Sequence, residues 1–141
     1  MNDTTKLEAM QEEEIVAYWS ERIKRATAEA RPLRLRGAGT KDWYGQQLQG
    51  EILDTRAYRG IIAYDPAELV LTARCGTPLT EVEALLAEHD QMLAFEPPHF
   101  GRASTVGGCI AAGISGPRRA QAGAARDFIL GVTLMNGAGK C

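Results

Sequence analysis

Two glycine-rich segments contain the residues whose types and spacing could bind a ligand. In the first, residues 36–41, glycines at 37 and 39 lie between an arginine and a threonine–lysine pair. Glycine lets the backbone reach positive φ and approach a ligand closely, and successive exposed N–H groups form a nest for phosphate oxygens. An ordinary tight turn explains this pattern equally well. The candidate phosphate-binding residues are Arg36, Gly37, Ala38, Gly39, Thr40 and Lys41.

The second segment runs from residue 97 to residue 115. At its centre, hydroxyl residues and a glycine pair precede a short helix of small residues, predicted from Thr105 to about Ser115. A helix N-terminus offers unpaired N–H groups and the positive end of a dipole, and both favour an anion. The alternative is a helix whose small residues only allow close packing. The candidate residues here are Ser104, Thr105, Gly107 and Gly108.

Motifs of several other functional classes are missing. A dinucleotide fingerprint that begins at Gly37 would need glycine at position 42, which is Asp42. A P-loop that ends at Cys141 would need serine or threonine there. Cys75 and Cys109 lie among apolar neighbours and form no CxxC pair, so we expect them in the core. The sequence therefore predicts no metal site and no histidine-based catalytic pair.

Composition excludes further classes of partner. Sixteen basic and eighteen acidic side chains give a net charge of −2, which favours neither nucleic acid nor an anionic membrane surface. No apolar run is long enough to span a bilayer, and the N-terminus lacks a signal pattern. We therefore expect a cytoplasmic protein without a nucleic-acid partner.

Periodicity and turn residues predict the elements that position the two segments. Apolar residues at helical spacing predict a helix over residues 7–30, ended by Pro32. Thr77 and Pro78 predict the N-cap and the first residue of a second helix. Short β-rich runs predict strands at residues 33–36, 52–53, 61–64, 69–73, 92–95 and 128–135.

The end of the chain indicates a hairpin without its second strand. Asn136 and Gly137 are typical of a two-residue hairpin turn, but only four residues follow them. We interpret the chain as the front part of a longer protein. Strands mixed with short helices predict an α+β fold, with an N-terminal helical segment at residues 1–30 and a main domain at residues 31–141.

Four segments together resemble the FAD-binding domain of the vanillyl-alcohol oxidase and p-cresol methylhydroxylase flavoprotein family. They are LRLRGAGTKDW (residues 33–43), VLTARCGTPLT (70–80), FEPPHFGRASTVGGCIAAGISG (95–116) and RDFILGVTLMNG (126–137). Each motif is weak alone, but their order and spacing match over roughly residues 30–137. The resemblance implies a p-cresol methylhydroxylase-type FAD-binding domain with small mixed sheets and short helices, incomplete at the C-terminus.

The resemblance also implies how FAD would be held. Residues 37–41 would wrap the diphosphate through backbone N–H groups, and Pro98 and residues 104–108 would lie along the diphosphate and the flavin-proximal part. Gly113 and Ser115 would pass close to the cofactor. For Arg118, a solvated loop charge is favoured over a phosphate contact. No histidine occurs between residues 30 and 45, so non-covalent FAD is expected.

The activity implied by the resemblance is that of an FAD-binding component of a 2-hydroxy-acid oxidoreductase, with glycolate as the expected substrate. The alternatives are a related dehydrogenase for D-lactate or another hydroxy acid, and a non-catalytic truncated fragment or assembly subunit. The family also implies a second flavoprotein subunit and an iron–sulfur subunit as partners. Through that complex, a cytoplasmic chain would be peripheral to the inner membrane. No catalytic acid or base is predicted within these residues.

Overall fold

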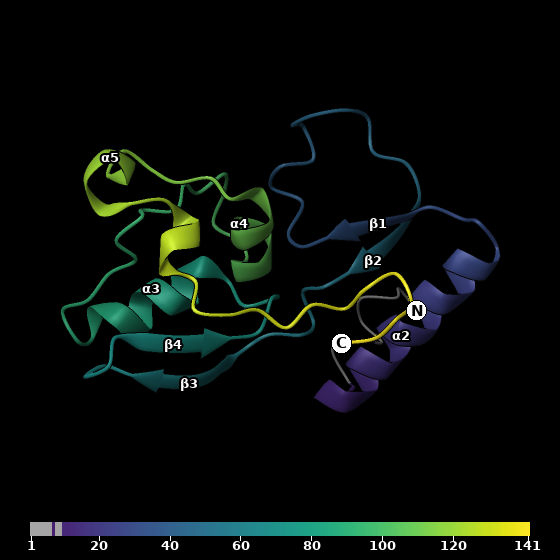
Figure 1. Cartoon of the computed structure of the whole chain (residues 1–141), viewed down its shortest axis with the longest axis horizontal. Coiled ribbons are helices and arrows are strands. Elements are labelled where there is room, and N and C mark those ends of the chain that lie inside the picture. Colours follow the sequence, from purple (N-terminus) through teal and green to yellow (C-terminus); the bar gives the residue numbers. More distant parts are fainter. Residues whose placement is uncertain (1–6, 8–9) are drawn as a thin grey trace.

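The computed structural model describes Leu7 and residues 10–141. These residues form two two-stranded sheets, in which β1 runs parallel to β2 and β3 runs antiparallel to β4. In Figure 1, α2 lies at one end of the molecule, the β3–β4 hairpin and α3 lie at the other, and α4 lies between α3 and β1. This arrangement confirms the α+β fold with small sheets and short helices. The elements are α2 (Glu12–Ala28), β1 (Leu33–Arg36), β2 (Glu51–Asp54), β3 (Ile61–Asp65), β4 (Val70–Ala73), α3 (Leu79–Ala87), α4 (Val106–Ala112), α5 (Arg119–Ala122) and the 3-10 helix η1 (Ala125–Phe128).

Helix α2 is shorter at both ends than the predicted residues 7–30, of which residues 8 and 9 lie outside the described part. At its start, the Glu14 carboxylate accepts the Gln11 N–H at 2.8 Å. At its end, Ala30 has a φ of 51° and the Arg31 N–H donates to the Ala26 carbonyl at 2.9 Å. This is the Schellman arrangement, which stops the helix before the proline does. The domain boundary expected at residue 30 falls just after the helix and stays a prediction.

Two small hydrophobic clusters form the core of the part of the chain that the structure describes. The first joins α2 to β2, and the Trp19 indole N–H also donates to the Asp54 carbonyl at 3.2 Å. The second lies between α3, α4 and η1, and so holds the start of α4 in place. None of the described helices is long and apolar enough to cross a membrane. The buried residues are Leu7, Ile15, Trp19 and Leu53 in the first cluster, and Leu79, Phe95, Cys109 and Ala125 in the second.

The three cysteines are free thiols. Cys109 belongs to the second cluster and Cys75 packs against the first, as predicted. Burial raises the pKa of both thiols, because it penalises the thiolate. Cys141 is exposed. In the part of the chain that the structure describes, no group of three or more His, Cys, Asp or Glu side chains could hold a metal ion.

Helix α3 begins one residue later than predicted. Thr77 is fully buried, and its hydroxyl donates to the Gly60 carbonyl at 3.1 Å while accepting the Gly60 N–H at 2.9 Å. Because these tertiary bonds occupy the side chain, Thr77 does not cap the helix. Pro78 stands at the N-cap position instead, and Leu79 is the first helical residue.

Two predicted strands are absent. Residues 92–95 form an irregular segment with a turn, Phe128 is the last residue of η1, and residues 129–135 are irregular. No other described residue forms a backbone hydrogen bond with residues 130–135. Apolar residues at alternate positions favour a strand only where a neighbour completes the ladder. Without one, Leu130, Val132 and Leu134 are 84%, 69% and 74% exposed.

The turn after this segment does form. The Asn136 N–H donates to the Lys140 carbonyl at 2.9 Å, so the chain reverses as the hairpin signal indicates. The turn rests on α2, where the Ser20 hydroxyl donates to the Gly139 carbonyl at 2.7 Å. Figure 1 shows the C-terminal segment, in yellow, crossing the molecule to reach this helix.

Candidate functional site

The first glycine-rich segment forms a turn directly after β1. Gly39 has a φ of +70°, a conformation that favours glycine, and the Asp42 N–H closes the turn onto the Gly39 carbonyl at 3.1 Å. Within the described residues, no hydrogen bond uses the backbone N–H groups of residues 37–41. Five successive donors are therefore available to a ligand, and phosphate binding there stays a prediction.

The two arginines of β1 are held by one carboxylate. Arg34 Nη2 lies 2.7 Å from Asp42 Oδ1, and Arg36 Nε donates to Asp42 Oδ2 at 2.8 Å. Hydrogen bonds from Arg34 and then Arg36 hold the pKa of the Asp42 carboxyl below its usual value. The Arg36 guanidinium also lies against Gly39, where a Cβ atom would collide with it. Asp42 thus holds in place the Arg36 guanidinium, which is predicted to contact a phosphate.

The second glycine-rich segment lies directly against the first, although more than 60 residues separate them in the sequence. A Cβ at Gly37 would be 2.7 Å from Thr105 Oγ1, so only glycine fits this approach. The Thr40 and Ser104 hydroxyl oxygens are 3.4 Å apart. Ser104 and Thr105 are both buried, and their hydroxyls lie against the first loop.

The start of α4 does not offer the predicted set of free amides. Four of the N–H groups between residues 104 and 108 donate within the protein, because this stretch packs against residues 75–77 and 101. Most N–H groups at the start of α4 are therefore not free, and phosphate binding by this segment stays a prediction. Close packing also accounts for Gly107, whose Cβ would lie 2.7 Å from the Cys75 Cβ. The donor–acceptor pairs are Ser104–Gly101, Val106–Thr77, Gly107–Cys75 and Gly108–Thr105.

The remaining candidate residues lie further from the first loop. Gly113 caps the C-terminal end of α4 and is eight residues from Thr105 at its start, which is roughly 12 Å along a helix. The Ser115 hydroxyl accepts the Ala125 N–H at 2.9 Å and so positions η1. Pro98 is half-buried in the irregular segment before α4. Their contacts with a cofactor, and those of the residues around them, stay predictions.

Arg118 is turned toward an acidic neighbour. Its Nε lies 3.6 Å from Glu96 Oε1, its backbone N–H donates to Glu96 Oε2 at 3.2 Å, and the side chain is largely exposed. Arg118 therefore pairs with Glu96 at the surface, and its interpretation as a solvated charge stays a prediction. Arg119 is also exposed.

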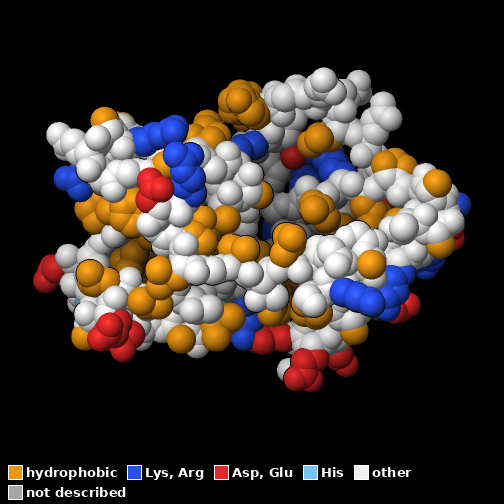
Figure 2. All heavy atoms as spheres, viewed as in Figure 1, with side chains coloured by type: hydrophobic (Ala, Val, Ile, Leu, Met, Phe, Trp, Pro, Cys, Tyr) orange, Lys and Arg blue, Asp and Glu red, His pale blue; other side chains and the backbone are white. Residues whose placement is uncertain are grey.

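An aromatic cluster beside the first loop was not predicted. The Trp43 ring contacts Tyr44 and Phe100, and its indole N–H donates to the Thr40 carbonyl at 3.0 Å. Lys41 Nζ lies 5.1 Å from the centre of the Phe100 ring. The signal in the sequence is the Trp43–Tyr44 pair, which comes directly after the glycine loop. Figure 2 shows the surface hollowed between this loop and α4, with basic side chains in blue on its wall.

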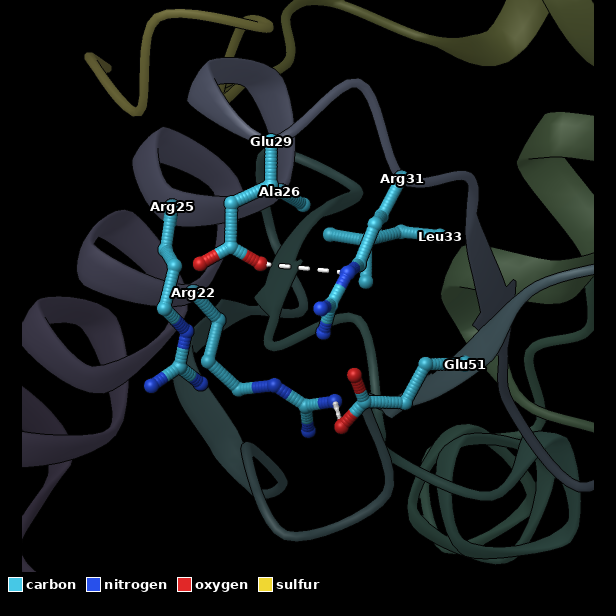
Figure 3. Close-up of a pocket in the computed structure, with 7 residues that line it drawn as sticks. All are labelled: Arg22, Arg25, Ala26, Glu29, Arg31, Leu33 and Glu51. Atoms are coloured by element: carbon cyan, nitrogen blue, oxygen red, sulfur yellow. Dashed lines mark hydrogen bonds and ion pairs between the residues drawn. The ribbon is translucent and has the colours of Figure 1, made fainter.

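A separate polar pocket of about 190 Å³ lies between α2 and the start of the β1–β2 sheet (Figure 3). Arg22 pairs with Glu51, and Arg31 Nε lies 3.2 Å from Glu29 Oε2. The pocket includes Leu33 at the first residue of β1, whereas the glycine loop follows the last. Four strand residues span roughly 10–13 Å, so the two places are distinct.

Comparison with known proteins identifies the family. The sequence matches the FAD binding domain family over residues 9–141. Glycolate oxidase subunit GlcE of Escherichia coli (strain K12) is 48% identical over 120 residues, which are 85% of this chain and 34% of that protein. D-lactate dehydrogenase (cytochrome) 1, mitochondrial, of Saccharomyces cerevisiae is 26% identical over 102 residues, which are 64% of this chain and 17% of that protein.

The chain spans about a third of the length of the first of these relatives, at 34%. No solved structure matches. The family match nonetheless covers almost every residue, including both glycine-rich segments and the aromatic pair. The chain therefore belongs to the FAD binding domain family.

Proposed function

We propose that this chain is the FAD-binding component of a 2-hydroxy-acid oxidoreductase that acts on glycolate. The loop of residues 37–41 carries the proposal, because it presents five successive free N–H groups beside an open hollow. The family and the 48% identity to a glycolate oxidase subunit support FAD as the ligand and glycolate as the substrate. The substrate would be bound by the assembled enzyme, since no residue here is assigned as a catalytic acid or base.

The residues fit a diphosphate in their charge as well as in their geometry. Arg34, Arg36 and Lys41 carry three positive charges and Asp42 carries one negative charge, which leaves two positive charges at the loop. The diphosphate of a dinucleotide carries two negative charges. Backbone N–H groups of residues 37–41 would donate to its oxygens, and a positive surround favours the anion.

The buried hydroxyls of Ser104 and Thr105 would keep this loop in place without contributing N–H donors. Because no histidine occurs between residues 30 and 45, FAD would be held without a covalent bond. When bound, FAD supplies the group that accepts a hydride equivalent from the α-carbon of the hydroxy acid. The chain's part is to bind the cofactor and orient it.

The similar proteins also support a second candidate substrate and a set of partner subunits. The match to a yeast D-lactate dehydrogenase favours D-lactate as the second candidate substrate. The first relative is named as a subunit, which supports a multisubunit enzyme. We propose a second flavoprotein subunit and an iron–sulfur subunit as partners, as the family resemblance implies.

Cofactor binding can be tested with the purified chain. FAD should be released by heat as free flavin, and FAD at a hundred times its dissociation constant should stabilise the fold by about 2.7 kcal/mol. Riboflavin, which lacks the diphosphate, should stabilise it much less. Lys41→Gln should weaken binding several-fold, whereas Arg118→Gln, the matched control in another loop, should not. A colourless protein that FAD does not stabilise would overturn the proposal and favour a non-catalytic fragment.

The substrate requires the assembled enzyme. Complexes isolated through a tag on this chain should reduce a dye acceptor with glycolate faster than with D-lactate. Faster reduction with D-lactate would reassign the substrate, and no reduction with either acid would overturn the 2-hydroxy-acid proposal.

A further inference from the structure

The aromatic cluster next to the glycine loop exposes an unusual amount of apolar ring surface. Trp43 is 69% exposed, Tyr44 65% and Phe100 37%. The Trp43 and Phe100 ring centres are 5.8 Å apart, with an angle of 59° between the rings. Large aromatic side chains gain most from burial, so three exposed ones in contact indicate a surface that another molecule covers.

The position of Trp43 depends on the loop that carries the free amides. Its indole N–H donates to the Thr40 carbonyl at 3.0 Å, so the ring is oriented before any ligand arrives. Lys41 Nζ lies 5.1 Å from the centre of the Phe100 ring, which belongs to the same cluster. An oriented ring, a cation and five N–H donors therefore lie within a few residues of one another.

A ligand that uses all three features must combine a planar apolar ring with an anionic group. A nucleotide has this combination, whereas an apolar protein segment would leave the N–H donors and the cation unused. We infer that Trp43, supported by Phe100, is the stacking platform for one planar ring system of the bound dinucleotide. This inference rests on the proposed function and extends it from the diphosphate to a ring.

The ring could come from either half of the dinucleotide, adenine or isoalloxazine, and both have the planar face that stacking requires. ADP carries the first ring and FMN the second, and each also carries phosphate for the loop. Titrating the full chain with each nucleotide therefore distinguishes the two sources. Tryptophan fluorescence reports the contact directly, because Trp19 is buried in the core and Trp43 is exposed.

One of the two nucleotides should quench the fluorescence of exposed Trp43. Trp43→Leu should abolish that quenching and weaken binding of the same nucleotide about tenfold, within the range measured for base stacking. The other nucleotide should bind both proteins equally. Trp43→Phe, which keeps a ring, should retain most of the affinity. Leu48→Ala, which removes another exposed apolar side chain of the same loop, is the matched control and should change neither affinity.

Two failures have different meanings. If the unaltered chain binds FAD but Trp43→Leu binds ADP, FMN and FAD as tightly, the stacking platform is wrong and the proposed function stands. The platform is also wrong, and the proposed function again stands, if Leu48→Ala weakens binding as much as Trp43→Leu does. If the unaltered chain binds none of the three nucleotides, the proposed function fails and the platform fails with it.

Discussion

Replacing Gly37 with alanine tests the contact between the two glycine-rich segments. The new Cβ would lie 2.7 Å from Thr105 Oγ1, whereas ordinary contacts begin at 3.4 Å, so the loops would have to part by about 0.7 Å, the difference of the two. Thr105 cannot turn away freely, because it is buried and its Oγ1 accepts the Gly108 N–H at 3.2 Å. Overpacking of this kind costs roughly 1–3 kcal/mol, and we expect Gly37→Ala to lower the free energy of unfolding by that amount.

A double-mutant cycle isolates this contact from other effects of the substitution. Thr105→Ala removes Oγ1 and should by itself cost about 1 kcal/mol, because the start of α4 loses its cap. In that background the alanine at position 37 has room, and its cost should fall below about 0.5 kcal/mol. The two substitutions should therefore couple by roughly 0.5–3 kcal/mol, the range found for residues in contact.

Urea unfolding followed by far-ultraviolet circular dichroism measures all four proteins of the cycle. Gly131→Ala is the control, because a Cβ there meets no heavy atom within 4 Å. It should change the free energy of unfolding by no more than about 0.5 kcal/mol. If Gly37→Ala costs the same with and without Thr105 Oγ1, the two segments do not meet at this pair, and the geometry of the site is refuted.

Three further predictions concern charge, thiols and the unpaired C-terminal segment. The folded pKa of Asp42 is lowered, so its stabilising effect is present above the ordinary value of 3.8 and is lost as the pH falls through the folded value. Asp42→Asn should therefore unfold more easily in urea at neutral pH, and the difference from the unaltered chain should shrink in acid. A thiol reagent should label Cys141 quickly in the native protein, and Cys75 and Cys109 only after unfolding, because burial raises the pKa of both. Fast labelling of all three thiols in the native protein would contradict the burial of Cys75 and Cys109. Val132→Lys should leave the free energy of unfolding within about 0.5 kcal/mol and should reduce aggregation in light scattering, because the segment is apolar, exposed and unpaired.

Local patterns predicted much of the fold. The apolar spacing of α2, the alternation of β1 and the small residues of α4 each depend on neighbours within a few positions, so the sequence alone indicates them. The glycine loop after β1 was predictable for the same reason, since Gly37 and Gly39 permit the turn. The resemblance to a flavoprotein family, drawn from four short segments, agrees with the family match.

Features that depend on distant partners were predicted wrongly or not at all. Residues 128–135 have the alternation of a strand, but a ladder needs a neighbour, and no described residue pairs with residues 130–135. Thr77 was predicted to cap a helix, but its hydroxyl forms hydrogen bonds with the backbone of Gly60. The amides at the start of α4 looked free, but Thr77 and Cys75 accept two of them. In each case a long-range hydrogen bond, present or missing, overrides a local preference.

The sequence by itself determined where the chain can bend sharply and to which family it belongs. Both depend on residue type, because glycine alone relieves the backbone at these turns. Only the tertiary structure decided which N–H groups stay free for a ligand. Those of residues 37–41 remain unused, whereas most of those at residues 104–108 are consumed by carbonyls and a hydroxyl. A backbone donor can serve a ligand only if the folded chain brings no acceptor to it, and that depends on contacts between residues far apart in the sequence.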